Sequence, residues 1–310
     1  MHARRRGMAL VVGAAVIWGT TGITAKLIFE ETSLDPTAVT WLRTLIATPV
    51  CLAFAWAALG RRIFAATRRD LGIMAAIGVV LVVCQFCYIA AVDLIGVSVA
   101  TLVSLCVPPV LVAVVSVLFL GERLTGRALT ALLGAVAGTV LLVGRIERGD
   151  DGGDWAAGVA LALAAAALIA AHILLSRAVA GRQPPWRPVA VTFPVGAVVF
   201  APVGLAGEFT LDLPLPGWLL LLYLAIVPSV LGAWLFQHGL REVPASTASV
   251  VTLLEPMVAA LLASVIFGER LGPAGWAGAA LLLGAIGLLS RGGPARPAIP
   301  DVPSPEAARR

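Results

Sequence analysis

The sequence predicts an all-α polytopic membrane protein with ten transmembrane helices, arranged as two inverted five-helix repeats. Composition gives the first reason, because 60% of the residues are hydrophobic, 13% are charged and the mean hydropathy is +0.98. A chain with so little polar surface cannot cover a water-soluble globule. The second reason is that its apolar residues gather in ten runs of helix length, separated by short polar segments.

A duplicated stretch gives the third reason. Residues 109–124 read PVLVAVVSVLFLGERL, and residues 256–271 read PMVAALLASVIFGERL, with their landmarks at one constant offset. Each copy opens with a proline and ends at Gly-Glu-Arg-Leu, which indicates that both halves descend from one unit. Because five spans are an odd number, the second unit enters the bilayer from the opposite side, and the halves are inverted repeats.

The apolar runs can be placed in order, because a helix needs about 20 mainly apolar residues to cross the hydrocarbon core. The expected spans are 8–28, 36–58, 71–91, 98–120, 126–144, 155–176, 188–206, 217–240, 244–267 and 273–290. We therefore expect a first repeat over 1–144, an external linker over 145–154, a second repeat over 155–290 and a disordered cytoplasmic tail over 291–310.

The basic residues predict the orientation. Most of the 22 lysines and arginines fall on the cytoplasmic side when the N-terminus is placed inside. With ten spans the C-terminus then also lies on the cytoplasmic side. We therefore expect a multi-pass protein of the inner cell membrane. The arginines stand in short loops and form no basic face, so no nucleic-acid partner is expected. The expected partners are a small-molecule substrate and the lipid bilayer, with the chain as a monomer or homodimer.

Enzymatic chemistry has little support in the sequence. The three histidines show no metal-ligand spacing, and no Walker motif is present, so we expect no metal, no cofactor and no direct use of ATP. Cys84 and Cys87 form a C-x-x-C, but a redox motif needs a soluble βαβ setting. We interpret these cysteines as packing residues.

Ionisable side chains inside the apolar runs are the first candidates for a substrate site. Arg43 lies too deep in its span to reach the interface, so it binds either a structural partner or a substrate carboxylate. Lys26 either snorkels to the outer interface, binds a structural partner or lines the cavity. Glu255 lies near the bilayer centre, where it serves a structural partner, proton coupling or a substrate amine.

Polar and aromatic side chains extend this set. Gln85 and Tyr88 share one helix face, as do Trp234, Gln237 and His238, and such groups either orient a ligand or bond neighbouring helices. The complete set of candidate substrate-binding residues is Trp18, Thr21, Lys26, Arg43, Gln85, Tyr88, Ser104, His172, Trp234, Gln237, His238 and Glu255.

Two prolines occupy matched positions in the two halves, Pro109 and Pro256. Proline inside a span frees a backbone carbonyl and bends the helix. The matched pair indicates either hinges for a rocking motion or plain kinked packing.

Several of these residues carry a family resemblance. Trp18-Gly19, Arg43, Tyr88, Glu255-Pro256 and the doubled Gly-Glu-Arg-Leu resemble the ten-span EamA branch of the drug/metabolite transporter superfamily, over residues 8–290. The resemblance implies a transporter with a central cavity, typically an exporter of amino acids or related small metabolites. The second half has no clear counterpart of Trp18-Gly19 or Arg43, so a site built from them would be asymmetric.

The sequence therefore favours a secondary transporter that works by alternating access between two inverted halves. Export of amino acids or similar metabolites is the first hypothesis for its cargo, and efflux of lipophilic drugs or cations is the alternative. A channel or a membrane enzyme fits less well, because the chain shows neither a repeated filter nor a catalytic constellation.

Overall fold

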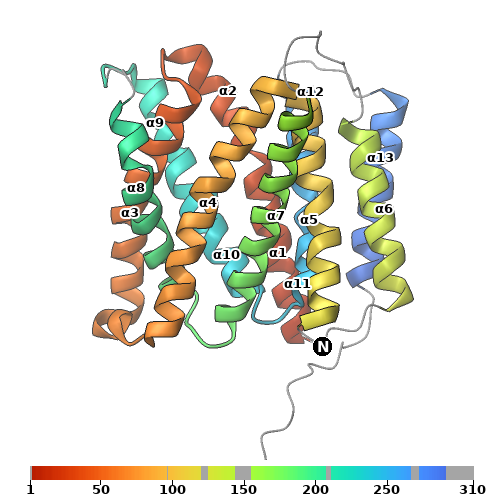
Figure 1. The fold of residues 1–310 in the computed structure, drawn as a ribbon, viewed down its shortest axis with the longest axis horizontal. Coiled ribbons are helices and arrows are strands. Elements are labelled where there is room, and N and C mark those ends of the chain that lie inside the picture. Colours follow the sequence, from red (N-terminus) through yellow and green to blue (C-terminus); the bar gives the residue numbers. More distant parts are fainter. Residues whose placement is uncertain are drawn as a thin grey trace, which may run out of the picture.

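A computed structural model describes residues 2–95, 97–119, 125–143, 155–206, 211–266 and 272–290, which form helices and, within these ranges, no strand. Both Gly-Glu-Arg-Leu copies, the expected linker 145–154 and the expected tail 291–310 lie outside the described residues. The helices stand side by side across one slab, and the N-terminus lies at the end drawn lowest in Figure 1, here called the lower end.

The expected membrane-spanning helices are present, and seven of them are single helices. These are α3 (Pro36–Leu59), α4 (Arg68–Ile95), α5 (Val97–Phe119), α6 (Gly126–Val143), α7 (Trp155–Ala180), α8 (Trp186–Ala206) and α13 (Pro273–Ser290). A 3-10 turn, η1 (Gly60–Phe64), follows α3. By length and composition 8 spans can cross a membrane, and the shorter apolar helices Gly126–Leu141 and Pro273–Leu289 bring the total to ten.

The other three spans are interrupted. The first consists of α1 (His2–Gly19) and α2 (Thr21–Glu31), and the ninth of α11 (Ala245–Val251) and α12 (Leu254–Ile266). The eighth consists of α9 (Leu215–Leu224), the π-helical η2 (Ala225–Leu231) and α10 (Gly232–Gly239).

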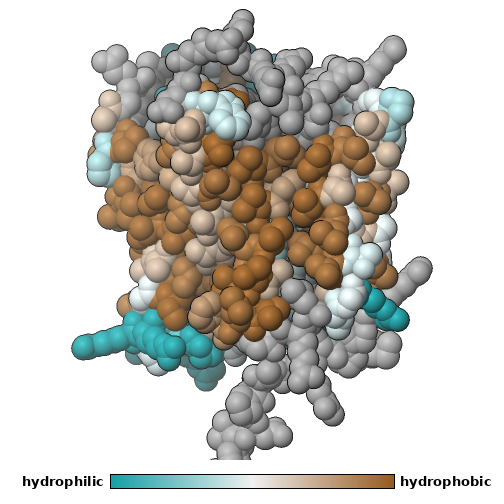
Figure 2. Space-filling model, turned by 45° about the vertical axis from the view of Figure 1, so that its right-hand side comes forward, coloured by the Kyte–Doolittle hydropathy of each residue, from teal (hydrophilic) through white to brown (hydrophobic). Residues whose placement is uncertain are grey.

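The outer surface is that of a membrane protein. Figure 2 shows apolar side chains in a band across the middle of the visible face, with hydrophilic side chains below it. Large apolar residues such as Leu133 and Val265 are 62% and 82% exposed. Exposure on this scale would be costly in water, and it is expected where hydrocarbon chains cover the helices.

The helices pack as two central groups and two end pairs (Figure 1). We call α4, α5 and α7 the front bundle, since α4 and α5 both pack on α7. The rear bundle is the first, eighth and ninth spans, because α1 packs on α10 and α12, and α2 on α9. The pairs α3 with α8 and α6 with α13 close the two ends.

The three interrupted spans meet at Trp18 and Gly19. Pro228 has no N–H for the Leu224 carbonyl, which instead accepts a hydrogen bond from Ser229 Oγ at 2.9 Å. The Pro228 carbonyl accepts one from Trp18 Nε1 at 3.0 Å. The indole therefore donates to a backbone carbonyl within the irregular π turn and ties the first span to the eighth.

Glycines allow this close approach. A Cβ atom on Gly232 would lie 2.7 Å from Trp18 Nε1, and one on Gly19 would lie 2.6 Å from Val258 Cβ and 2.8 Å from the Glu255 carbonyl oxygen. No side chain larger than hydrogen fits at either position without a shift of a neighbouring helix.

The interruptions do not coincide with the two expected hinge prolines. α5 continues through Pro109 without a break. In the ninth span the turn falls at Thr252 and Leu253, and Pro256 stands in the first turn of α12, where its missing N–H costs no helical hydrogen bond. The role of these prolines as hinges stays a prediction.

Gly19→Ala should lower the unfolding temperature in detergent, because the added methyl group collides with Val258 and the Glu255 carbonyl. Overpacking of this kind costs about 1–3 kcal/mol. Gly22→Ala is the matched control, since a Cβ there meets nothing within 4 Å, and it should leave the unfolding temperature unchanged or slightly raised. Equal unfolding temperatures for the two variants would show that the contact of Gly19 with Val258 and the Glu255 carbonyl has room for a methyl group.

Candidate substrate site

Two opposite charges lie within the bundle. Arg43 on α3 and Glu255 at the start of α12 are both partly buried, and each is the charged group whose field acts on the other. The described contacts between these two side chains include no direct ion pair. The site therefore presents a guanidinium and a carboxylate that are coupled through space and come from different halves of the chain.

Tyr88 on α4 belongs to the same site. The field of Glu255 also acts on its phenol, and Tyr88 Oη shares a hydrogen bond of 2.7 Å with Thr101 Oγ1 on α5. Sequence reasoning missed Thr101, although it lies three residues before the candidate Ser104 and thus on the same helix face. Ser104 itself is buried and donates to the Ala162 carbonyl on α7 at 3.4 Å, so it bonds two helices of the front bundle.

Glu255 is positioned by the junction of the interrupted spans. Its N–H donates to the Thr252 carbonyl at 3.0 Å, directly after the break between α11 and α12. The close approach of Gly19 to the Glu255 carbonyl fixes the first span against the same turn. Trp18 and Glu255 are therefore held near each other by backbone contacts.

An aromatic column leads from Trp18 toward the lower end. Trp18 and Phe236 have ring centroids 5.1 Å apart, and His172 on α7 stacks on Phe236 with centroids 5.9 Å apart. His172 Nδ1 is buried and has no hydrogen-bond partner in the structure. The column joins the rear bundle to the front bundle beneath the charged pair.

Trp234 and His238 form a second aromatic cluster. Their rings meet edge to face at 5.3 Å, and Trp234 stacks on Trp186 of α8 at 5.4 Å. Gln237, between them in sequence, is buried and donates to the Ser176 carbonyl on α7 at 3.3 Å. Of the candidates on α10, Gln237 therefore bonds a neighbouring helix, whereas Trp234 and His238 pack in an aromatic cluster.

The remaining candidates, Thr21, Lys26 and Gln85, are at least partly exposed. Thr21 begins α2 and is partly exposed, and Lys26 is exposed further along the same helix. Gln85 is partly exposed on α4, one turn before Tyr88. Among the described residues, no cluster of three His, Cys, Asp or Glu side chains could hold a metal ion.

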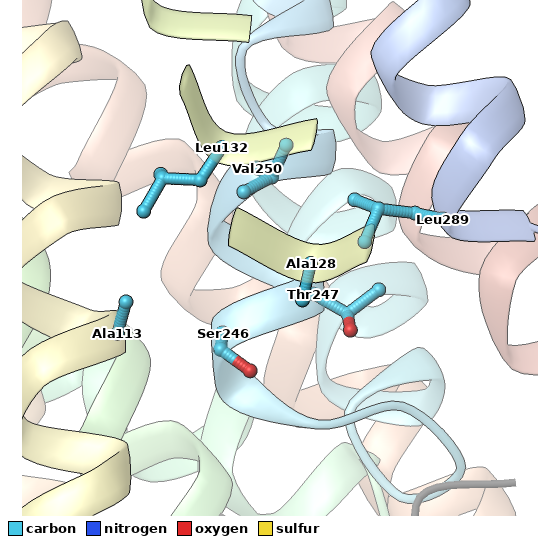
Figure 3. A pocket seen from close by; sticks show the side chains of 7 residues that line it. All are labelled: Ala113, Ala128, Leu132, Ser246, Thr247, Val250 and Leu289. Atoms are coloured by element: carbon cyan, nitrogen blue, oxygen red, sulfur yellow. The ribbon is translucent and has the colours of Figure 1, made fainter. Parts of the chain in front are cut away.

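A small pocket lies apart from these residues, between α5, α6, α11 and α13 (Figure 3). Its volume of about 10 Å³ is enough for about one water molecule. Its lining contains no candidate residue and consists of Ala113, Ala128, Leu132, Ser246, Thr247, Val250 and Leu289.

The family follows from comparison with known proteins. The sequence matches the EamA-like transporter family over residues 5–144 and again over 156–291. The chain belongs to this family. The resemblance to the drug/metabolite transporter superfamily is thereby confirmed, and EamA-family members are transporters.

Relatives of this EamA-family chain align over almost its full length. It is 32% identical over 289 residues to the "Uncharacterized transporter YwfM" of Bacillus subtilis (strain 168), covering 90% of this chain and 91% of the relative. It is 28% identical over 302 residues to the "Uncharacterized inner membrane transporter YicL" of Salmonella typhimurium, covering 94% of this chain and 97% of the relative. A solved crystal structure matches with a TM-score of 0.79 at 22% identity, covering 91% of this chain and 96% of that chain, which shows the same fold.

The coupling between Arg43 and Glu255 can be measured as a double-mutant cycle. Arg43→Gln and Glu255→Gln should each destabilise the protein, because each leaves the other charge uncompensated. The double variant should be less destabilised than the sum by about 0.5–3 kcal/mol, measured by unfolding in detergent. Pairing Arg43→Gln with Glu242→Gln, an exposed glutamate, should give additive effects; additivity in the first cycle would contradict the coupling.

Proposed function

We propose that this EamA-family transporter exports amino acids or related small metabolites. The observation that carries the proposal is the pairing of Arg43 and Glu255 without a direct ion pair, beside Tyr88 and Trp18. A guanidinium matches a carboxylate in geometry and charge. A carboxylate accepts hydrogen bonds from an ammonium group, so the two side chains together suit a molecule that carries both charges.

Efflux of a lipophilic cation is the second candidate function. The Trp18 and Phe236 rings are in contact, and Gly19, the residue after Trp18, approaches the Glu255 backbone. Aromatic faces and a carboxylate together bind organic cations, with the ring quadrupole supplementing the full negative charge. Under this alternative Arg43 is the structural partner that balances Glu255 when no cargo is bound.

We propose that two inverted repeats, 1–144 and 155–290, carry out the transport by alternating access. The helix contacts support this division, because each span of the first repeat corresponds to the span five places later in the second. The third span packs on the sixth (α4 on α7), and correspondingly the eighth span packs on the first. The fourth span packs on the sixth (α5 on α7), and correspondingly the ninth packs on the first. The family match, which occurs once in each half, also supports it.

The two bundles are joined at the lower end. One cluster of buried residues unites α1, α5, α6, α7, α11, α12 and α13, with members such as Val11, Val112, Ile173 and Leu282. Arg177 of α7 also donates to the Leu240 carbonyl, which follows α10. Around the opposite end of α4, in contrast, Ala91 and Ile95 pack with Ala100 and Ala162 within the front bundle.

We propose that this arrangement is the state closed toward the cytoplasm, with both chain termini on the cytoplasmic side. The orientation rests on the basic residues, since the exposed arginines Arg61, Arg62, Arg68 and Arg69 lie where α3 ends and α4 begins, at the lower end. A transporter in this state receives or releases cargo on the outer side and must break the lower contacts to reach the cytoplasm.

A counterflow screen in liposomes tests the cargo. Purified protein should exchange amino acids in preference to nucleosides and quaternary cations. Arg43→Gln should reduce exchange about 10- to 100-fold, the worth of a hydrogen bond to a charged group. Arg69→Gln, which removes an exposed guanidinium from α4, should exchange like the wild type. Preference for permanent cations would replace the amino-acid proposal, and wild-type exchange by Arg43→Gln would remove Arg43 from the site.

Cysteine accessibility tests the closed lower end. Ala248 on α11 is fully buried there, so Ala248→Cys, in a background with the native cysteines replaced by alanine, should react slowly with an impermeant thiol reagent. Arg177→Gln removes the donor to the Leu240 carbonyl and should raise the rate from the cytoplasmic side up to about tenfold. Arg241→Gln, an exposed control, should not; faster labelling from outside would contradict the proposed orientation.

A further inference from the structure

We infer that the connection between α3 and α4 is a binding site for the headgroup of an anionic phospholipid. We call this segment, Gly60 to Arg69, the basic linker. The inference rests on the membrane-spanning fold and is independent of the cargo.

The basic linker concentrates exposed positive charge. Arg61, Arg62, Arg68 and Arg69 are all exposed and lie within nine residues of sequence. Asp70 is the carboxylate nearest to them in sequence, but it is 4% exposed and already bound by side chains from another connection. Four guanidiniums therefore face the headgroup region, and guanidinium is the side-chain group best suited to phosphate.

Two of these arginines stand at an unfavourable place for a cation. Arg68 and Arg69 are the first residues of α4, where the helix dipole carries its positive end. Cations in a first turn destabilise a helix, whereas an anion bound there is stabilised by the same dipole and by the charges of the arginines. A phosphate group at this end would thus relieve the repulsion that the sequence creates.

An aromatic pair marks the depth of the site. Phe64 is 79% exposed and Trp56 is 53% exposed, and their rings meet edge to face with centroids 6.4 Å apart. The amphipathic indole of a tryptophan such as Trp56 is typical of the boundary between headgroups and hydrocarbon, and Phe64 packs on it there. A ligand next to them has to offer both a charged group for the arginines and an apolar body for the rings, which is the chemistry of a phospholipid.

The basic linker is held in place from below by a buried hydrogen-bond network. Asp70 accepts from Arg182 at 2.8 Å and from Gln183, both in the connection between α7 and α8. Arg187, which is 6% exposed, donates to the Gln183 side chain and to the Arg62 carbonyl. The backbone of the linker is thereby fixed to α8, while its own four arginine side chains stay exposed.

The local backbone agrees with a preformed site. Gly60 ends α3 with φ of +52°, a left-handed conformation that glycine adopts at low cost, and the chain then turns into η1. Thr67 Oγ1 caps α4 by accepting from the Asp70 N–H at 3.1 Å. A linker that is ordered before binding loses less conformational entropy when a lipid arrives.

Native mass spectrometry of the full chain in detergent tests the inference, with phosphatidylglycerol and phosphatidylcholine of identical acyl chains as probes. The wild type should retain phosphatidylglycerol in preference. The fourfold variant with Arg61, Arg62, Arg68 and Arg69 changed to glutamine should lose this preference by at least about tenfold. A matched fourfold variant of other exposed arginines, Arg5, Arg6, Arg127 and Arg241 to glutamine, removes the same charge and should keep it.

Each alternative has its own result. Equal loss in both fourfold variants would reduce the effect to general positive charge and overturn the inference, as would a preference that survives in the linker variant. Phe64→Ser should weaken retention of the lipid but leave binding of soluble glycerol phosphate unchanged. If glycerol phosphate competes as well as the lipid, the site is a free-phosphate site and the inference fails. Should the fourfold variant not fold, the pairs Arg61/Arg62 and Arg68/Arg69 are changed separately.

Discussion

The hydrogen bond from the Trp18 indole to the Pro228 carbonyl is the contact on which the centre of this protein depends. A break in a helix inside hydrocarbon exposes backbone groups that no water can satisfy, so each break needs an internal partner. Here the breaks of three spans are brought together. Trp18 of the first span donates to the Pro228 carbonyl of the eighth, Ser229 donates to the Leu224 carbonyl within the eighth, and Gly19 leaves the space in which the first and ninth spans meet. The interruptions of the three spans are therefore stabilised together at one junction.

The same junction explains where the charges lie. A carboxylate in the middle of a membrane span is costly unless it is paired, hydrogen-bonded or placed in a cavity. Glu255 stands two residues after the break in the ninth span, where the chain is already irregular and Arg43 acts on it from α3. The front bundle contributes Tyr88, whose phenol is held by Thr101. The site is thus shared between a bundle of continuous helices and a bundle of interrupted ones.

Most of the fold could be predicted from the sequence, because span length and hydropathy are set by the thickness of the bilayer. The second span, expected over 36–58, is α3 at Pro36–Leu59. The breaks escaped prediction, since Gly19 and Pro228 resemble residues that many continuous membrane helices tolerate. Their effect depends on Trp18 and Val258, which only the tertiary structure brings near.

Part of the candidate site can likewise be recognised in the sequence, whereas the part that depends on tertiary contacts cannot. Arg43 and Glu255 are visible as charges within apolar runs, whereas Thr101 is an ordinary span residue until Tyr88 lies beside it. The network of Asp70, Arg182 and Arg187 was missed because loop residues were weighed for orientation alone. Orientation depends on how many basic residues a loop carries, while a hydrogen-bond network depends on which carboxylate each of them meets.

The unequal division of breaks has a mechanical consequence. In the front bundle α4, α5 and α7 continue without interruption over 28, 23 and 26 residues. Pro108 and Pro109 remove two N–H donors within α5, but bending α4 or α7 would strain consecutive backbone hydrogen bonds. In the rear bundle the bonds are already rearranged at Gly19, within η2 and at Thr252. Further bending there changes few additional bonds, because the regular helical pattern is already interrupted and side chains donate to the Leu224 and Pro228 carbonyls. Bending that accompanies motion between the two bundles should therefore be concentrated in the rear bundle. Glu255 and Trp18 would then move relative to Tyr88 in the front bundle, so that bending of the interrupted spans would change the geometry of the proposed site.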